Sequence, residues 1–364
     1  MGKKRKAVFL LGAGFSAPAK IPTQEALLSR IRGLRSEDSE IVDRFVKDFF
    51  NHRGNVPLED IFTALDKSIS EDQSLREYDT TALWKVRFSL NKCLSKVLAA
   101  SNIIRPKYVE DFARVILDIR MKEHLSDKVA ILSTNWDMLL DSTLGRLMPD
   151  PYYFRVINEK EQRALYIDYC ISDEQLDKRA KIRRSLLIKG LGYFNVKLVK
   201  LHGSINWLKC PSCQYLYVGY GNELDEWIAG KTKYCRECNK RKGDRIPLRP
   251  FLISPTFLKD LDNVHSQTSW WSAGIELREA SDLYIIGYSL PLADFELRYL
   301  LARNVSIAVS RIKVILKSHN RHKYKDTLEK ERYVDFFGRD ISRNIEFHGV
   351  EHFTKLMREE LSYL

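Results

Sequence analysis

The sequence predicts an α/β fold: a Rossmann-like parallel sheet with helices on both faces, plus a helical insertion and a small four-cysteine zinc ribbon. Three observations predict it. Apolar runs typical of strands buried on both faces lie at 6–11, 128–132, 282–290 and 311–318. Segments with helical periodicity separate these runs, which is the pattern of a parallel sheet. Two C-x2-C pairs lie between the second and the third run.

The chain divides into three kinds of segment. From 36 to 125 the periodicity is helical, with apolar residues three or four apart in IVDRFVKDFF, LEDIFTALDKSI and YVEDFARVILDI. We interpret residues 36–125 as a bundle of four or five helices inserted between the first two strands. The cysteine-bearing segment 209–247 is a separate small unit. The Rossmann-like domain is then assembled from the remaining segments, 1–35, 126–208 and 248–364.

Composition and charge narrow the possible partners. The 364 residues are 44% hydrophobic and 30% charged, as in ordinary globular proteins. No apolar run approaches the roughly 20 residues that span a bilayer, so we expect a cytoplasmic protein without a membrane partner. The net charge of +12 favours anionic partners, including nucleic acid. Three basic clusters are either solvated faces or include a real binding surface: Lys178–Arg184, Lys231–Arg249 and Arg311–Lys325.

Four short motifs directly follow predicted strands: GAGFS, STNWD, LHGS and GYSL. Because ligands of open parallel sheets bind beyond the carboxyl ends of the strands, we expect these motifs to meet at one site. Gly12-Ala13-Gly14 suits a backbone that approaches a pyrophosphate closely at the start of a helix. The third glycine of the dinucleotide fingerprint is missing, however, so a strand-terminating turn explains this motif equally well.

Polar side chains in the other motifs offer acid–base chemistry, and each also has a structural interpretation. His202 lies at a strand end, where it is either a general base or a structural histidine. Asn135 and Asp137 either cap the following helix or hold a water or a ribose hydroxyl. Asp294 most simply caps a helix, although it too lies shortly after a strand.

The cysteines predict a metal site. Cys210, Cys213, Cys235 and Cys238 form two C-x2-C pairs separated by 21 residues. Four thiolates in two close pairs match tetrahedral zinc, and a disulfide framework is disfavoured in a cytosolic chain. Because all four ligands are thiolates, we expect a structural rather than a catalytic zinc. The remaining Cys93 and Cys170 are expected to be packing residues.

In this order, the motifs resemble the sirtuin superfamily. Members carry a glycine-alanine-glycine turn with a following serine and an Ile-Pro pair, as in GAGFS and Ile21-Pro22 here. A turn with asparagine and aspartate two apart is similar to Ser133–Asp137. A histidine-glycine pair, a four-cysteine ribbon and a late glycine-x-serine follow, as in His202-Gly203 and Gly287-Tyr288-Ser289.

The resemblance implies a site that cleaves NAD at the nicotinamide–ribose bond. His202 would be the general base, Asn135 would orient the ribose and the attacking water, and Asp137 would support the nicotinamide end. The implied NAD-binding residues are Gly12, Ala13, Gly14 and Ser16 at the pyrophosphate, Gly287 and Ser289 near the adenosine half, and in addition Thr134 and Asp294. NAD is then the substrate, and structural zinc is the one metal.

Departures from protein deacylases refine this expectation. Thr23-Gln24-Glu25 stands where deacylases have an arginine, and Pro250–Asp260 replaces the strand that helps to form their acyl-peptide groove. Together with the helical insertion, these features look like the divergent bacterial sirtuin-like proteins that degrade NAD in antiphage defence. We therefore expect an NAD glycohydrolase that yields nicotinamide and ADP-ribose. The alternatives are an NAD-dependent deacylase or ADP-ribosyltransferase, and a non-catalytic NAD or ADP-ribose sensor or nucleic-acid-binding zinc-ribbon protein.

The resemblance also implies control of the activity, because an unrestrained NADase would kill its host. We expect a homo-oligomer or gating by a partner protein such as a helicase-like ATPase, an Argonaute-type protein or a phage component. The helical insertion offers surface for such contacts.

Overall fold

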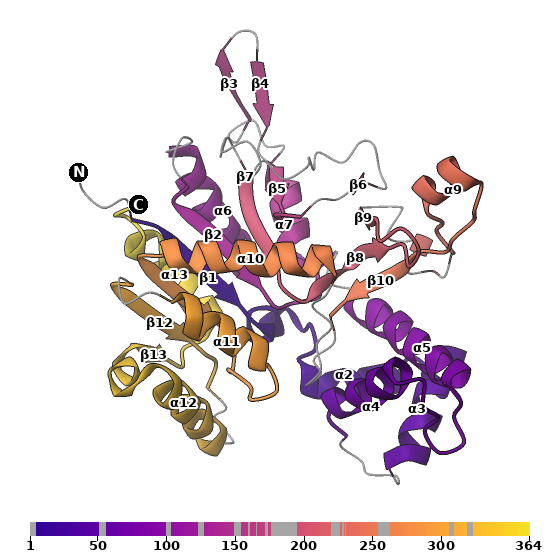
Figure 1. The fold of residues 1–364 in the computed structure, drawn as a ribbon. Coiled ribbons are helices and arrows are strands. Elements are labelled where there is room, and N and C mark those ends of the chain that lie inside the picture. The colour runs from indigo at the N-terminus through magenta and orange to yellow at the C-terminus, as the bar shows by residue number, and fades with distance from the viewer. Residues whose placement is uncertain are drawn as a thin grey trace.

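A computed structural model gives the fold of most of the chain (Figure 1). The residues that it describes are 5–50, 56–99, 103–122, 127–148, 154–158, 161–164, 166–171, 174–175, 195–219, 226–227, 229, 231–253, 263–305, 309–318 and 323–364. The first basic cluster, Lys178–Arg184, lies outside these residues.

A seven-stranded sheet forms the centre of the molecule, in the order β13-β12-β11-β1-β2-β7-β5. All neighbouring strands in it are parallel. Its strands are β1 (Ala7–Leu11), β2 (Val129–Ser133), β5 (Tyr166–Asp168), β7 (Asn195–Lys200), β11 (Asp282–Ile286), β12 (Arg311–Ile315) and β13 (Ile345–Glu346). Leaving aside β5 at the edge, the chain order of the strands is 3-2-1-4-5-6, the order of doubly wound nucleotide-binding sheets. The predicted α/β fold with a parallel sheet is confirmed.

Helices cover both faces of the sheet (Figure 1). Phe9 and Leu11 of β1 belong to one apolar core, whereas Val8 and Leu10 belong to another, as the alternation of side chains along a strand requires. The first face is covered by α6 (Lys107–Lys122), α7 (Leu139–Leu147) and α13 (Val350–Glu360). The second is covered by α10 (Val264–Glu279), α11 (Phe295–Asn304) and α12 (Lys323–Phe337).

The segment between β1 and β2 is helical, as predicted. A short helical turn, α1 (Ala13–Ser16), is followed by a 3₁₀ turn (Ala17–Ala19) and then by α2 (Gln24–Arg32), α3 (Glu37–Phe50), α4 (Leu58–Ser70) and α5 (Thr80–Ala99). Helices α2, α3 and α4 pack around α5. Helix α6 instead packs on the central sheet, where Phe112 makes an edge-to-face contact with Phe9 of β1 at 5.4 Å between ring centroids.

A smaller sheet projects from the carboxyl side of β7. Its strand order is β10-β8-β9-β6, and β8 pairs antiparallel with both β10 and β9. Its elements are β6 (Glu174–Gln175), β8 (Gly203–Lys209), β9 (Leu216–Val218) and β10 (Arg249–Leu252), together with the helix α9 (Arg236–Lys242). The chain also forms a separate antiparallel pair, β3 (Phe154–Asn158) and β4 (Glu161–Ala164), and a 3₁₀ turn, Arg339–Asn344.

An ion-pair cluster closes the amino edge of the central sheet. The ammonium group of Lys6 lies 2.5 Å from a Glu276 carboxylate oxygen and 2.7 Å from one of Asp127. Lys197 makes equivalent contacts, at 2.6 Å to Glu276 and 2.5 Å to Asp127. Burial opposes the charge of Lys6, but Glu276 and Asp127 outweigh it and raise the Lys6 pKa.

No helix in the described part of the chain is both long and apolar enough to cross a membrane.

Candidate functional site

The loops after β1, β2, β7 and β11 meet at the carboxyl edge of the central sheet. The register sets this, because Leu11 lies opposite both Ser133 of β2 and Ile286 of β11. All four sequence motifs therefore lie together, as their positions after strands predicted. They fall where the strand order reverses, between β1 and β11, which is where doubly wound sheets form a binding crevice.

The glycines of the first and last motifs hold two loops in direct contact. Gly287 has a φ of +63°, and a Cβ on it would lie 2.2 Å from the Phe15 nitrogen. The Gly14 N–H donates to the Gly287 carbonyl at 2.7 Å, and the Gly12 N–H donates to the Ile286 carbonyl at 2.9 Å. In this conformation these two amides are thus used within the protein. Both loops need glycine because their backbones touch.

The STNWD motif is tied to the GAGFS loop. The Asn135 amide nitrogen donates to the Gly12 carbonyl at 2.9 Å and to the Ser16 hydroxyl at 3.3 Å. Thr134, which is half-buried, donates through its N–H to the Leu11 carbonyl at 3.0 Å. Asn135 and Ser16 are both buried. The side chain of Asn135 therefore fixes the GAGFS turn in addition to any contact that it makes with a ligand.

Asp137 is a buried carboxylate at the start of α7. Its Oδ1 accepts the N–H of Leu139, the first residue of α7, at 2.9 Å, although the N-cap position itself is held by Met138. Burial raises the Asp137 pKa, although Lys200 and hydrogen bonds from Leu139 and Ser16 act in the opposite direction. The buried ammonium group of Lys200 donates to the Asp137 carbonyl at 2.5 Å and to Asp141 Oδ2 at 3.3 Å.

His202 faces the loop after β11. Its Nε2 lies 3.6 Å from Asp294 Oδ1 and has no hydrogen-bond partner among the described residues. Asp294 is at the N-cap position of α11 but makes no capping hydrogen bond with its side chain. Its Oδ2 instead accepts the Tyr288 hydroxyl at 2.7 Å. Asp294 therefore occupies the expected N-cap position, but its carboxylate faces His202 and Tyr288 and does not cap the helix.

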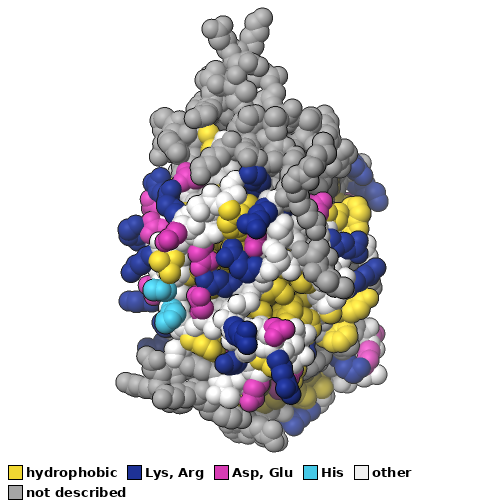
Figure 2. Space-filling model, turned by 90° about the vertical axis from the view of Figure 1, so that its left-hand side faces the viewer, with side chains coloured by type: hydrophobic (Ala, Val, Ile, Leu, Met, Phe, Trp, Pro, Cys, Tyr) yellow, Lys and Arg dark blue, Asp and Glu magenta, His cyan; other side chains and the backbone are white. Residues whose placement is uncertain are grey.

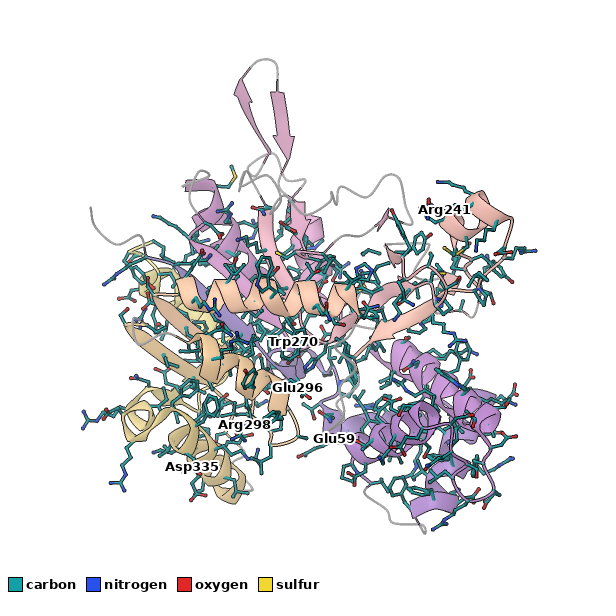
Figure 3. All side chains as sticks on the ribbon, in the orientation of Figure 1. Glu59, Arg241, Trp270, Glu296, Arg298 and Asp335 are labelled. Atoms are coloured by element: carbon teal, nitrogen blue, oxygen red, sulfur yellow. The ribbon has the colours of Figure 1, made fainter. Side chains whose placement is uncertain are left out.

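Trp270 of α10 closes this side of the site. Its ring is roughly parallel to that of His202, with centroids 6.3 Å apart, and its indole N–H donates to the Leu201 carbonyl at 3.0 Å. Figure 3 shows Trp270 and Glu296 near the centre of the molecule, between α10 and the start of α11. The His202 carbonyl accepts the Ile253 N–H just beyond β10 at 2.9 Å. Gly203 has a φ of +72° and lies against Phe251, so glycine is needed after this histidine.

Sequence reasoning missed Lys200, Tyr288 and Trp270. Lys200 carried a usable signal, because a lysine in an otherwise apolar strand needs a buried partner. Tyr288 lies within the GYSL motif, in which the resemblance points only to the glycine and the serine. Nothing in the sequence around Trp270 indicates a site residue. Ser289, by contrast, is only half-buried, and its carbonyl accepts from Arg332 at 3.3 Å.

The four ribbon cysteines come together. Their sulfur atoms all lie within 4.8 Å of one another, with Cys210 Sγ 3.7 Å from Cys238 Sγ and Cys213 Sγ 3.5 Å from Cys235 Sγ. Tetrahedral zinc with Zn–S bonds of about 2.3 Å separates its sulfurs by about 3.8 Å, so the four thiols fit this metal. The predicted cluster is confirmed as a metal-binding arrangement. Cys93 and Cys170 are buried away from it, as packing residues are.

Comparisons with known proteins return only remote structural likeness. No protein-family profile matches the chain, and no curated protein matches it. Among solved structures it is similar to Sir2Tm bound to a propionylated peptide, at 14% identity and a TM-score of 0.42, with 99% of this chain and 94% of that chain covered. It is similar to a Sir2 homologue mutant in complex with ADP-ribose, at 14% identity and a TM-score of 0.45, with the same coverage. At these TM-scores the likeness carries no argument, and function is inferred from the residues.

Proposed function

We propose that this chain is a sirtuin-like NAD glycohydrolase that cleaves NAD to nicotinamide and ADP-ribose. The observation that carries the proposal is the position of His202. A buried imidazole nitrogen without a protein hydrogen-bond partner among the described residues lies beside Asp294 at the carboxyl edge of a doubly wound sheet. Asn135 belongs to the same edge and is joined to the GAGFS loop.

The proposed reaction breaks the bond between ribose C1′ and the nicotinamide nitrogen. The bonding electrons go to the pyridinium ring, which leaves as neutral nicotinamide, and the ribose develops oxocarbenium character. A water adds to C1′ and loses its proton to His202 Nε2, which acts as general base. Asp294 stabilises the resulting imidazolium, because its carboxylate lies 3.6 Å from the same nitrogen.

The other residues have supporting roles in this proposal. Asn135 orients the ribose and the water. Asp137 accepts hydrogen bonds from the Leu139 N–H at the start of α7 and from the Ser16 hydroxyl, and so holds both in place. Contact of the pyrophosphate with the Gly12 and Gly14 amides requires exchange of their present bonds to Ile286 and Gly287. We also propose NAD contacts at five further residues on the same edge: Ala13, Ser16, Thr134, Gly287 and Ser289. Cys210, just after β8, and the other three ribbon cysteines would hold a structural zinc, and elemental analysis is expected to give one zinc per chain.

The wider biological role rests on the resemblance alone. We propose that NAD depletion serves antiphage defence in the cytoplasm, and that assembly into a homo-oligomer or contact with a partner protein restrains it. A deacylase or an ADP-ribosyltransferase uses the same cofactor, and a silent NAD sensor binds it without turnover. These alternatives are separated by their products.

The test is to incubate the purified chain with NAD and to separate the products, with and without an acetyl-lysine peptide. Nicotinamide and ADP-ribose are expected without peptide, and both are expected to disappear in His202→Ala and Asn135→Ala. The exposed His352→Ala is the matched control and is expected to retain activity. Turnover only with the peptide would favour the deacylase, and NAD binding without turnover would favour the sensor. A chain that neither binds nor cleaves NAD would overturn the proposal.

A further inference from the structure

A cavity lies outside the carboxyl-edge site, between α5 and the zinc-ribbon sheet. Its volume is about 850 Å³. One wall is formed by α5, and the other is formed by β10 with neighbouring ribbon residues. Figure 1 shows α5 beside the ribbon sheet. None of the proposed NAD-site residues lines the cavity. Its chemistry is therefore separate from that of His202.

Exposed aromatic rings line the cavity. Trp84 and Phe88 lie one turn apart on α5, and each is 46% exposed. Tyr234 of the ribbon is 39% exposed. Large aromatic side chains bury most of their area in a typical fold, so three exposed rings around one recess are unusual. A large part of each ring is therefore exposed to solvent.

Cationic side chains accompany these rings. The Arg249 guanidinium lies 5.1 Å from the Trp84 ring centroid, and the Lys92 ammonium lies 5.7 Å from that of Phe88. Lys209, also on the lining, lies 5.3 Å from the ring centroid of Phe251. Each wall therefore presents rings together with positive charge.

The described lining residues carry more positive than negative charge, although Lys92 is paired with Asp38 at 2.8 Å and Lys231 with Glu226 at 2.9 Å. The basic residues of the lining are Lys85, Arg87, Lys92, Lys209, Lys231 and Arg249. Among the described lining residues the one acidic residue is Asp66, which is paired with Arg87 at 2.6 Å. On the face shown in Figure 2, by contrast, Lys and Arg side chains are interspersed with Asp and Glu. The basic cluster Lys231–Arg249 of the sequence thus contributes its two ends to the cavity.

We propose that this cavity binds single-stranded nucleic acid, with bases stacked on Trp84 and Phe88 and phosphates near Arg249, Lys209 and Lys92. Stacking on aromatic rings beside a cationic groove is how proteins hold single strands without sequence preference. An acidic peptide would use the cations but would leave the rings unused. A duplex keeps its bases stacked inside, so it cannot offer them to rings within a recess. More than one ring–cation pair favours a strand over a single nucleotide.

The test measures fluorescence anisotropy of a labelled 12-nucleotide oligo-dT and of a 12-nucleotide RNA with the full chain, without NAD. Binding is expected to weaken steeply between 50 and 200 mM salt. Trp84→Ala is expected to weaken binding at least about tenfold. Arg249→Ala is expected to weaken it and to reduce the slope of log affinity against log salt by about 0.7.

Matched controls separate the cavity from the general positive charge. Trp271→Ala removes a tryptophan that is 72% exposed on α10, and Arg303→Ala removes an exposed arginine on α11. Both are expected to bind like the wild type, and circular dichroism checks the fold of every variant. The proposal is overturned if no strand binds, if Trp84→Ala and Trp271→Ala behave alike, or if a 12-base-pair duplex, AMP or a poly-glutamate peptide binds as tightly as oligo-dT.

Discussion

The two edges of the central sheet both carry buried charge, but they use it differently. At the amino edge, Lys6 and Lys197 each contact Glu276 and Asp127 within 2.7 Å. At the carboxyl edge, His202 Nε2 stays 3.6 Å from Asp294 and has no hydrogen-bond partner among the described residues. Charges paired at 2.5–2.7 Å have their partners within the protein, whereas a buried polar atom 3.6 Å from its neighbour in a crevice is available to a ligand.

The pKa values of buried carboxyl groups at the two edges are shifted in opposite directions. At the amino edge burial works against the charge of Asp127, but Lys6 and Lys197 outweigh it and lower the Asp127 pKa. At the carboxyl edge burial outweighs Lys200 and raises the Asp137 pKa. The amino edge therefore favours the charged form of Asp127, whereas the carboxyl edge disfavours the charged form of Asp137. The comparison separates a structural cluster from a functional one, and four measurements test it.

The largest expected effect is on stability at the amino edge. Glu276→Ala leaves two buried ammonium groups with one anion fewer, and removing one partner of a buried pair costs about 3–5 kcal/mol. Glu279→Ala is the matched control, because Glu279 contacts the same Lys6 but is 55% exposed. Glu279→Ala is expected to lower the free energy of unfolding by less than about 1 kcal/mol. Urea denaturation measures both, and equal losses would contradict the structural role of Glu276.

At the carboxyl edge the loss is expected in turnover instead. His202→Ala removes the proposed general base and is expected to lower NAD cleavage about 10²–10⁴-fold. Because Nε2 of this imidazole has no hydrogen-bond partner among the described residues, the free energy of unfolding should change by less than about 1.5 kcal/mol. Destabilisation as large as that of Glu276→Ala would make His202 a structural residue and would remove the contrast between the edges.

A smaller effect is expected from Asp294, which acts through His202. Asp294→Asn keeps the shape and the acceptor for Tyr288 but removes the negative charge, so kcat/KM should fall about tenfold. Tyr288→Phe removes only the hydroxyl donor and should lower kcat/KM less. Steady-state kinetics with NAD measures both variants. If Tyr288→Phe is the more damaging, orientation of the carboxylate matters more than its charge.

The smallest expected effect is on the pH dependence of stability, and its sign differs between the edges. The folded pKa of Asp127 lies below its usual value of 3.8, so its contribution is present above that value and is lost as pH falls through the folded pKa. The folded pKa of Asp137 lies above 3.8, so its contribution is present below that value and is lost as pH rises through the folded pKa.

Unfolding curves between pH 7 and pH 3 measure this difference. Asp127→Asn should flatten the loss of stability toward acid, whereas Asp137→Asn should steepen it. Changes of the same sign in the two variants would show that the edges do not differ in how they hold a carboxylate.

The sequence predicted those parts of the fold that depend on local pattern. Apolar runs located β1, β2, β11 and β12, and the spacing of Cys210 and Cys238 predicted the metal cluster. The same helical periodicity could not separate α6, which packs on the sheet, from α3 to α5, which pack on one another. Both kinds of helix show an apolar stripe, and the stripe does not say what covers it.

The candidate site was predicted in position but not in its internal contacts. A motif after a strand fixes which edge it occupies, and this brought Gly12, Asn135, His202 and Gly287 together. The partner of Asp294 could not be predicted, because a position just before a helix suggests a cap whichever way the side chain turns. The contact of Gly14 with Gly287 joins residues far apart in the chain, which local patterns do not report.

Strand β10 and the residue after it connect the two proposed ligand sites. Its first residue, Arg249, pairs with Lys209 beside the cysteine cluster and lines the cavity. Just past its last residue, Ile253 also lines the cavity and donates its N–H to the His202 carbonyl. Thermodynamic linkage is reciprocal, so if an occupant of the cavity shifts this strand and changes the affinity for NAD, NAD changes the affinity for that occupant by the same factor. One backbone hydrogen bond would then connect a nucleic-acid sensor to an NAD-consuming centre.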